Sequence, residues 1–198
     1  MTLTTRLARV ATDAVVRWPR LWPLFRRSME RQFDALAPRW DAMRSGEPFA
    51  AFEAALAAIP GPVADALDLG TGTGDGAAAV KRAFPDARVV GADVSEQMLG
   101  IARQKVPDVE FVRVDAAALP FPDESFDLVT HANMIPFFDE LARVLRPRGS
   151  ALFAFSLGPR TPIYVSSERL RSELGRRGFT DFAEFAAGPG TALLARRR

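Results

Sequence analysis

The sequence contains no cysteine, one histidine, one tyrosine and two lysines among its 198 residues. The absence of cysteine excludes disulfides and thiolate chemistry, and it fits the reducing conditions of the cytoplasm. No apolar run is long enough to span a membrane. Arginines also interrupt the first seventeen residues, where a signal peptide would need an apolar core. We therefore expect a cytoplasmic protein without a membrane span.

Neither sign of charge is in large excess, because 26 basic and 24 acidic side chains give a net charge of +2. The basic surplus lies at the two ends of the chain, in residues 6–31 and in the last three residues. A nucleic-acid-binding protein needs a basic patch together with elements that read bases, and the sequence shows none. Hydrophobic residues make up 48% of the chain, which suffices for the core of one domain. We therefore expect no nucleic-acid partner.

One stretch, residues 66–76, organises the rest of the chain. Apolar residues lead to Asp68, four glycines follow at alternate positions up to Gly76, and an alanine-rich segment comes next. This order is typical of a buried strand, a tight turn and a helix, with glycine allowing positive φ angles in the turn. A turn without side chains lets a ligand lie against the backbone, beside the unpaired N–H groups of the helix. The stretch therefore predicts a site for a nucleotide-type ligand.

Short apolar runs alternate with helical segments after residue 62. The apolar runs predict strands over residues 63–69, 87–92, 109–114, 126–131 and 150–157. Helices are predicted over residues 74–83, 95–105, 137–145 and 167–177, and a hairpin over residues 179–186 and 191–195. This alternation requires a mostly parallel sheet with helices on both faces. We therefore expect an α/β fold with a doubly wound, Rossmann-like sheet of seven strands that ends in an antiparallel hairpin.

The first sixty residues show helical spacing only. Helices are predicted over residues 2–16, 23–33 and 47–59, with a short helix near residues 38–43. Pro60-Gly61-Pro62 then forms a clear break. We therefore divide the chain into an N-terminal helical lid segment, residues 1–60, and a ligand-binding catalytic domain, residues 61–198.

Tryptophan and arginine are interleaved in residues 15–31, where the first two predicted helices meet. Two interpretations compete for this stretch. Its aromatic side chains can pack on the main domain as part of a lid, or they can contact a membrane surface together with the arginines. Scattered aromatic residues pack inside proteins more often than they contact lipid, which favours the lid.

Three acidic residues stand at the ends of three successive predicted strands. Asp68 precedes the glycines, Asp93 ends the second strand and Asp115 follows the third. The carboxyl ends of parallel strands are where open α/β sheets bind ligands, and an acid on the second strand binds ribose hydroxyls. A register that starts at Gly72 also fits a dinucleotide pattern, so an NAD(P)-dependent oxidoreductase is an alternative. Against it, Tyr164 has no lysine near it in sequence, and an acid before the turn suits a ligand ammonium group better than a pyrophosphate.

The same residues resemble a known family. Residues 67–74, LDLGTGTG, resemble motif I of the class I S-adenosylmethionine-dependent methyltransferases. Residues 90–99, VGADVSEQML, resemble the family's second strand with its ribose-binding acid, and residues 115–129, DAAALPFPDESFDLV, resemble its adenine-binding stretch. Residues 141–149, LARVLRPRG, are similar to the family's helix and turn before the fifth strand. The subgroup resembled is the small-molecule type that includes the methyltransferases of ubiquinone and menaquinone biosynthesis.

The resemblance implies a role for each matched position. The backbone at Gly70 and Gly72 would approach the methionine part of S-adenosylmethionine, with Asp68 near its amino group. Asp93 would bind the ribose hydroxyls, and Asp115 would accept a hydrogen bond from the adenine amino group. The full cofactor-binding set implied in this way is Asp68, Gly70, Thr71, Gly72, Gly74, Asp93, Val94, Met98, Asp115, Ala116 and His131. No metal ion is expected.

The acceptor side of the predicted site departs from the family. Arg148 stands where the family usually has glycine, and the segments after the fourth and fifth strands are short, so the N-terminal segment has to cover the substrate. His131, the only histidine, is the natural general base if the acceptor starts protonated, and otherwise it is a wall residue. The candidate substrate-pocket residues are Trp40, Asp41, Phe137, Phe138 and Tyr164, although core or loop packing explains each of them equally well.

The expected reaction is methyl transfer from S-adenosylmethionine to a small acceptor, which can be lipophilic. A sulfonium methyl group is already activated, so in-line displacement depends mainly on positioning and desolvation. The first alternative is a domain that binds the cofactor without catalysis and serves as an interaction module. The second is the oxidoreductase named above, which predicts affinity for a nicotinamide cofactor.

Overall fold

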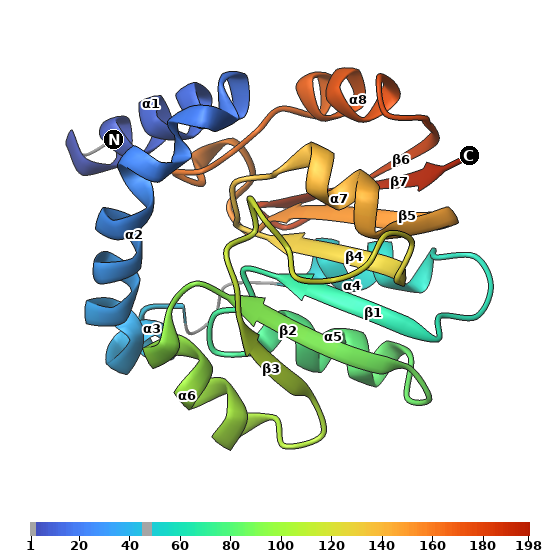
Figure 1. Ribbon diagram of the computed structural model, residues 1–198, viewed down its shortest axis with the longest axis horizontal. Coiled ribbons are helices and arrows are strands. Elements are labelled where there is room, and N and C mark those ends of the chain that lie inside the picture. The colour runs from blue at the N-terminus through green and yellow to red at the C-terminus, as the bar shows by residue number, and fades with distance from the viewer. Residues whose placement is uncertain (1–2, 45–48) are drawn as a thin grey trace.

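The described residues form one sheet of seven strands with helices on both faces (Figure 1). The computed structural model describes residues 3–44 and 49–198. The strands are β1 (Asp65–Leu69), β2 (Arg88–Asp93), β3 (Glu110–Arg113), β4 (Phe126–Ala132), β5 (Leu145–Phe155), β6 (Phe179–Ala187) and β7 (Gly190–Arg197). They lie in the order β3-β2-β1-β4-β5-β7-β6.

The first five strands are parallel and the last two form an antiparallel hairpin. β1 pairs with β2 and β4, β2 also pairs with β3, and β4 also pairs with β5. β7 runs antiparallel to both β5 and β6. The predicted fold class is therefore confirmed. The strand order changes direction between β1 and β4, and open α/β sheets bind their ligands at such a point.

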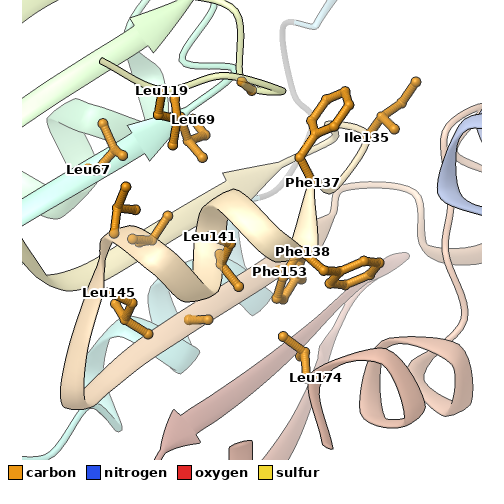
Figure 2. Packing of buried hydrophobic residues seen from close by; sticks show 14 of the residues in the cluster. Leu67, Leu69, Leu119, Ile135, Phe137, Phe138, Leu141, Leu145, Phe153 and Leu174 are labelled. Atoms are coloured by element: carbon orange, nitrogen blue, oxygen red, sulfur yellow. The ribbon is translucent and has the colours of Figure 1, made fainter. Parts of the chain in front are cut away.

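Two helical layers cover the sheet. Helices α7 (Phe138–Val144) and α8 (Ser167–Gly175) pack on one face, and α4 (Ala50–Ala57), α5 (Asp75–Ala83) and α6 (Glu96–Lys105) pack on the other. Successive residues of β1 contribute to both layers, because Leu67 belongs to the α7 cluster and Ala66 to the α5 cluster. Figure 2 shows part of the α7 cluster, in which Leu141 lies close to Phe153. Burial on both faces explains why the strands read as continuous apolar runs.

Helix α4 belongs to the layers of the sheet, although it lies before the predicted boundary at residues 60–62. Its residues Phe52 and Leu56 are buried in the same cluster as Leu194 of β7. The described part of this helix begins at Ala50, and the predicted start at residues 47–48 lies outside the described residues. The division at residue 60 stays a prediction.

The remaining N-terminal helices stand across the carboxyl ends of the parallel strands (Figure 1). Helix α1 (Leu3–Arg17) ends before Pro19, and a short 3₁₀ turn connects it to α2 (Trp22–Leu36). Helix α2 continues past the predicted end at Phe33, because no helix-breaking residue occurs before Pro38. A second 3₁₀ turn leads to α3 (Trp40–Met43). We call residues 3–44 the cover.

Strand β5 begins earlier than the sequence pattern predicts, at Leu145 instead of Ser150. Its pairing with β4 shifts between these two residues, so the predicted turn is a bulge inside the strand. Within the bulge Arg148 has a φ of 65°, a left-handed conformation that favours glycine. The arginine at this position therefore strains the backbone locally, and the strand continues beyond it.

Candidate functional site

The turn between β1 and α5 is built on left-handed glycines. Gly70, Gly72 and Gly74 have φ angles of 68°, 54° and 91°, a conformation that costs other residues about 1–2 kcal/mol. The Gly70 N–H donates to the Ala92 carbonyl oxygen of β2 at 2.8 Å, which ties the turn to the next strand. The turn therefore presents bare backbone at the switch point of the sheet.

Asp68 at the end of β1 is buried, with 1% of the residue exposed. Its Oδ1 accepts a hydrogen bond of 2.6 Å from the Thr130 hydroxyl of β4. Its Oδ2 has no hydrogen-bond partner among the described residues and lies 2.7 Å from where a Cβ would stand at Gly76. Burial raises the pKa of this carboxyl to about 6, against the opposing effect of the Thr130 hydroxyl. Only glycine at position 76 leaves room for the carboxylate.

Asp93 at the end of β2 fixes the glycine turn from the side. Its Oδ2 accepts the Gly72 N–H and its Oδ1 accepts the Ser95 N–H, each at 2.9 Å. Burial raises the pKa of Asp93, and the two amide hydrogen bonds lower it. Each oxygen of the carboxylate still has a second lone pair, which is available to a ligand hydroxyl.

Asp115 after β3 is held by the cover. Its Oδ1 accepts the indole N–H of Trp22 at 2.7 Å and the Ala117 N–H at 3.0 Å. Its Oδ2 accepts a hydrogen bond of 2.9 Å from the guanidinium of Arg26. Both donors from the cover belong to α2, so this helix is anchored on the acid that follows the third strand.

Further polar side chains of the cover contact the same edge of the sheet. Asp34 accepts a hydrogen bond of 2.5 Å from the Ser95 hydroxyl, and Glu30 pairs with Arg113. Asp41 accepts a hydrogen bond of 2.6 Å from the Thr73 hydroxyl in the glycine turn. Trp22, Arg26, Glu30 and Asp34 recur every four residues, so one stripe of α2 makes these contacts.

A pocket of about 950 Å³, part of it open to solvent, lies between the cover and the sheet. The loops of the sheet contribute one wall, which we call the sheet wall: Asp68, Leu69, Gly70, Thr71, Gly72, Asp75, Gly76, Ala92, Asp93, Val94, Met98, Val114 and Ala116. The cover contributes Trp22, Met29, Phe33, Trp40 and Arg44. The rim consists of Phe49, Ala132, Asn133, Met134, Ile135, Phe137 and Ile163.

Most residues of the predicted cofactor set line this pocket, and three do not. Gly74 caps α5, and a Cβ there would lie 3.2 Å from the side chains of Phe111 and Val106. Asp115 faces the cover through the contacts described above. His131 lies in the core beside β5.

The predicted acceptor residues are split between pocket and core. Trp40 and Phe137 line the pocket, whereas Asp41 is exposed and Tyr164 packs on Phe155 with ring centroids 5.0 Å apart. Figure 2 shows that Phe137 and Phe138 diverge: the former lies with Ile135, and the latter lies beside Phe153.

Sequence reasoning missed the inner face of α2. Trp22, Met29 and Phe33 line the pocket from one side of this helix. Their spacing of seven and four residues is helical, so the periodicity of the sequence contained the signal. No local pattern indicated the polar contacts of α2, because their partners lie far away in the sequence.

His131 is 1% exposed and stacks on Phe153, with ring centroids 4.7 Å apart and planes at 17°. Neither imidazole nitrogen has a hydrogen-bond partner among the described residues. Burial lowers the pKa of this imidazole to about 3, so the ring is neutral at physiological pH.

Two classes of feature are absent from residues 3–44 and 49–198. No group of three or more histidine, aspartate or glutamate side chains there could hold a metal ion. No helix in these ranges is both long and apolar enough to cross a membrane.

Comparison with known proteins shows which family the segment that carries the site resembles. A family described as "Methyltransferase domain" matches residues 66–149. A demethylmenaquinone methyltransferase of Thermus thermophilus is 41% identical over 136 residues, covering 59% of this chain and 60% of the relative. A ubiquinone/menaquinone biosynthesis C-methyltransferase of Desulfotalea psychrophila is 36% identical over 136 residues, covering 61% and 55%. The chain thus spans a little over half the length of these two relatives.

Solved structures share the fold at low sequence identity. A methyltransferase of Aquifex aeolicus that depends on S-adenosylmethionine has a TM-score of 0.67 at 19% identity, covering 83% of this chain and 98% of its own. The cyclase SpnF also has a TM-score of 0.67, at 18% identity, covering 85% and 94%. The same fold thus occurs in proteins named for different reactions. The match over residues 66–149 thus identifies this segment as a methyltransferase domain, and the chain shares its fold with a methyltransferase that depends on S-adenosylmethionine.

Proposed function

We propose that this protein transfers a methyl group from S-adenosylmethionine to a small lipophilic acceptor. The observation that carries the proposal is the pocket at the carboxyl ends of β1, β2 and β4, where a glycine turn, the buried Asp68 and the partly buried Asp93 face aromatic side chains. One relative described above is named a demethylmenaquinone methyltransferase and the other a ubiquinone/menaquinone biosynthesis C-methyltransferase, which supports a lipophilic acceptor of that character. The lack of cysteine suits the cytoplasm, which we propose as the compartment.

The residues of the sheet wall suit the methyl donor. Two buried atoms that line the pocket, Asp68 Oδ2 and Thr71 Oγ1, have no partner among the described residues. An ammonium group of the donor would satisfy the carboxylate oxygen, and the ribose hydroxyls would use the remaining lone pairs of Asp93. Val94 and Met98 offer an apolar surface for the adenine ring.

The adenine end of the site involves the cover as well as the sheet. Asp115 Oδ1 already accepts two hydrogen bonds, whereas Oδ2 accepts one from Arg26 and has a lone pair left. We propose that this lone pair accepts from the adenine amino group. The Ala116 N–H is then the proposed donor to the same edge of the ring.

The acceptor is proposed to lie between the rim and the cover. Phe33, Trp40 and Phe137 supply aromatic walls there, and the Arg44 guanidinium lies 5.5 Å from the Trp40 ring centroid. Such a lining suits a flat, apolar acceptor that carries a polar group. Asp41, Phe138 and Tyr164 are proposed to support the site from outside the pocket.

S-adenosylmethionine supplies a methyl group already activated by its sulfonium. The protein therefore has to orient the acceptor in line with that methyl group and to exclude water from it. Met134, which lies 2.8 Å from where a Cβ would stand at Gly70, and Phe137 of the rim restrict the space next to the glycine turn. We propose His131 as a packing residue of the core, because its nitrogens reach neither the pocket lining nor a polar partner among the described residues.

The cover is proposed to close the site. Its stripe of polar contacts on α2 meets residues that follow β2 and β3, and Asp41 meets the glycine turn. Because the same acid, Asp115, is proposed to contact adenine, the cover and the cofactor would stabilise each other's position. Exchange of the cofactor then requires these contacts to open.

The proposal is tested by calorimetry with S-adenosylhomocysteine, followed by a turnover assay. We expect binding in the micromolar range and release of S-adenosylhomocysteine when S-adenosylmethionine is mixed with a reduced naphthoquinone. Absence of cofactor binding would refute the proposal. Binding without turnover on any naphthoquinone or ubiquinone precursor would favour the non-catalytic interaction module, and affinity for NADH instead would favour the oxidoreductase.

A further inference from the structure

The cover has a second face with a different character. All large hydrophobic side chains that are exposed in the described part of the chain belong to it: Val10 at 66%, Trp18 at 46%, Leu24 at 75% and Met43 at 59%. Isolated exposed apolar residues are ordinary in proteins, so these side chains indicate a contact only together with the charges beside them. Trp18 and Leu24 flank the junction of α1 and α2, which lies at one corner of the molecule (Figure 1).

The acidic side chains of α2 lie on one face of the helix only. Both acids of the helix, Glu30 and Asp34, contact the sheet domain. The outward positions Arg27 and Arg31 are exposed and form no ion pair with another described residue, and Arg20 in the preceding turn is the same. We call Trp18, Arg20, Leu24, Arg27 and Arg31 the outer face.

Helical spacing places three of these side chains together. Leu24, Arg27 and Arg31 are separated by three and four residues, which puts them on one side of the helix. Arg17 lies over the Trp18 ring, with its guanidinium carbon 5.0 Å from the ring centroid, and adds a further positive charge at the corner. The outer face thus combines apolar side chains with uncompensated guanidinium groups.

We infer that the outer face docks on an anionic lipid bilayer. Arginine binds phosphate through paired hydrogen bonds, and tryptophan is favoured at the level of lipid headgroups. A single exposed tryptophan and leucine give weak binding alone, and each basic residue near an anionic surface adds about 1 kcal/mol. Charge complementarity therefore selects an anionic bilayer as the partner, and the apolar side chains hold the protein on its surface.

The two sides of α2 then have different roles. Trp22, Met29 and Phe33 on the inner side of α2 line the pocket, while Leu24 and Arg27 point outward. The lid and the membrane contact are then two faces of one helix, and they no longer compete. A lipophilic molecule dissolved in the bilayer would meet the protein at the helix that lines its pocket. Docking itself does not depend on the proposed methyl transfer.

The test is flotation of the full-length protein with vesicles. We expect binding to vesicles of phosphatidylcholine and phosphatidylglycerol in equal parts at low ionic strength, and little binding to phosphatidylcholine alone. The double variant Arg20→Gln/Arg27→Gln is expected to weaken partition about thirtyfold, from the contribution of two basic residues. The variant Trp18→Ser/Leu24→Ser is expected to remove the binding that persists in high salt, which screens charges but not apolar contacts.

A matched control separates this face from net charge. Arg148 lies in the bulge of β5, and Arg198 directly follows β7, whose Arg196 pairs with Ser150 of β5. Both are exposed and lie at the end of the sheet away from the cover. The variant Arg148→Gln/Arg198→Gln changes the charge equally and is expected to bind vesicles as the wild type does. Equal losses in the two arginine pairs would overturn the inference, as would wild-type protein that does not float with the mixed vesicles. Duplex DNA that competes with the vesicles at equal phosphate concentration would identify a general polyanion surface and would also overturn it. Calorimetry with S-adenosylhomocysteine on every variant keeps failure here distinct from failure of the proposed function.

Discussion

The sheet wall of the pocket is built largely from backbone, whereas the cover is built from side chains. Gly70 and Gly72 bring main chain to the ligand side of the turn, and Asp93 is fixed by amide hydrogen bonds from Gly72 and Ser95. The cover instead relies on long side chains such as Trp22 and Arg26, whose partners lie in another element. A wall built from backbone suits a ligand that many related proteins share, because it depends little on side-chain identity. A cover built from side chains can change by substitution and so adapt to one acceptor.

The largest effect is expected in the sheet wall, from Asp93→Asn. The variant loses the charged acceptor that we propose for the ribose hydroxyls, and a hydrogen bond to a charged group contributes about 1.5–3 kcal/mol. We expect the dissociation constant of S-adenosylhomocysteine to rise about a hundredfold by calorimetry, which corresponds to about 2.7 kcal/mol. Asp86→Asn is the control, because Asp86 is exposed in the turn before β2. An increase below threefold, with an unchanged thermal melt, would remove Asp93 from the cofactor site.

In the cover, Trp22→Phe is expected to act on the rate of cofactor release. Phenylalanine keeps an aromatic ring next to Phe137, whose centroid lies 5.2 Å from that of Trp22, but it cannot donate to Asp115. Loss of one hydrogen bond to a carboxylate corresponds to about a tenfold faster dissociation in stopped-flow displacement. The exposed Trp18→Phe serves as control. If both variants released the cofactor at the wild-type rate, the cover would be independent of cofactor binding.

The two regions also differ in how far sequence predicts them. The strands, the glycine turn and the acids Asp68 and Asp93 follow from local patterns, because each lies within or directly beside the strand that positions it. The contacts of Asp115 could not be predicted, since Trp22 and Arg26 are 93 and 89 residues away in the chain. Helical periodicity shows that α2 has two faces without showing what each face meets.

The different positions of two neighbouring aromatic residues could not be predicted from the sequence either. Phe137 lines the pocket and Phe138, the next residue, is buried against Phe153, because helix α7 begins between them and turns the second ring to the core. The bulge at Arg148 is similar: proline and glycine indicated a break, and only pairing with β4 shows that the strand passes through it. In both cases contacts between distant parts of the chain decide the outcome, and these contacts cannot be seen in a single sequence.

Asp68 makes the sheet wall sensitive to pH. Its pKa of about 6 lies above the usual 3.8, so the stability it contributes is present below about 3.8 and is lost as pH rises through about 6. A bound ammonium group would lower this pKa, so cofactor binding would release a proton and affinity would rise with pH. We expect binding of S-adenosylhomocysteine to be about tenfold weaker near pH 5 than near pH 7. Asp68→Asn should flatten this dependence, and an unchanged slope in the variant would assign it to another group, such as Asp93.

The smallest effect on turnover is expected from His131→Leu, a substitution in the buried strand β4. A general base contributes about 10²- to 10⁴-fold, whereas a buried imidazole stacked on Phe153 contributes packing alone. We therefore expect kcat/KM for the accepted naphthoquinone to change less than about threefold. Because neither nitrogen has a partner among the described residues, leucine should raise the free energy of unfolding by about 1 kcal/mol.

A pH series of melts gives His131→Leu a second readout. The folded pKa of about 3 lies below the usual 6.5, so the unfolded chain binds a proton first and the wild type loses stability as pH falls from 6.5 toward 3. The leucine variant should lack this part of the acid destabilisation. A hundredfold loss of kcat in a variant that melts normally would instead make His131 the base, and the ring would then have to leave the core during turnover. Such a result would also mean that the acceptor binds next to β4 and not only between the rim and the cover.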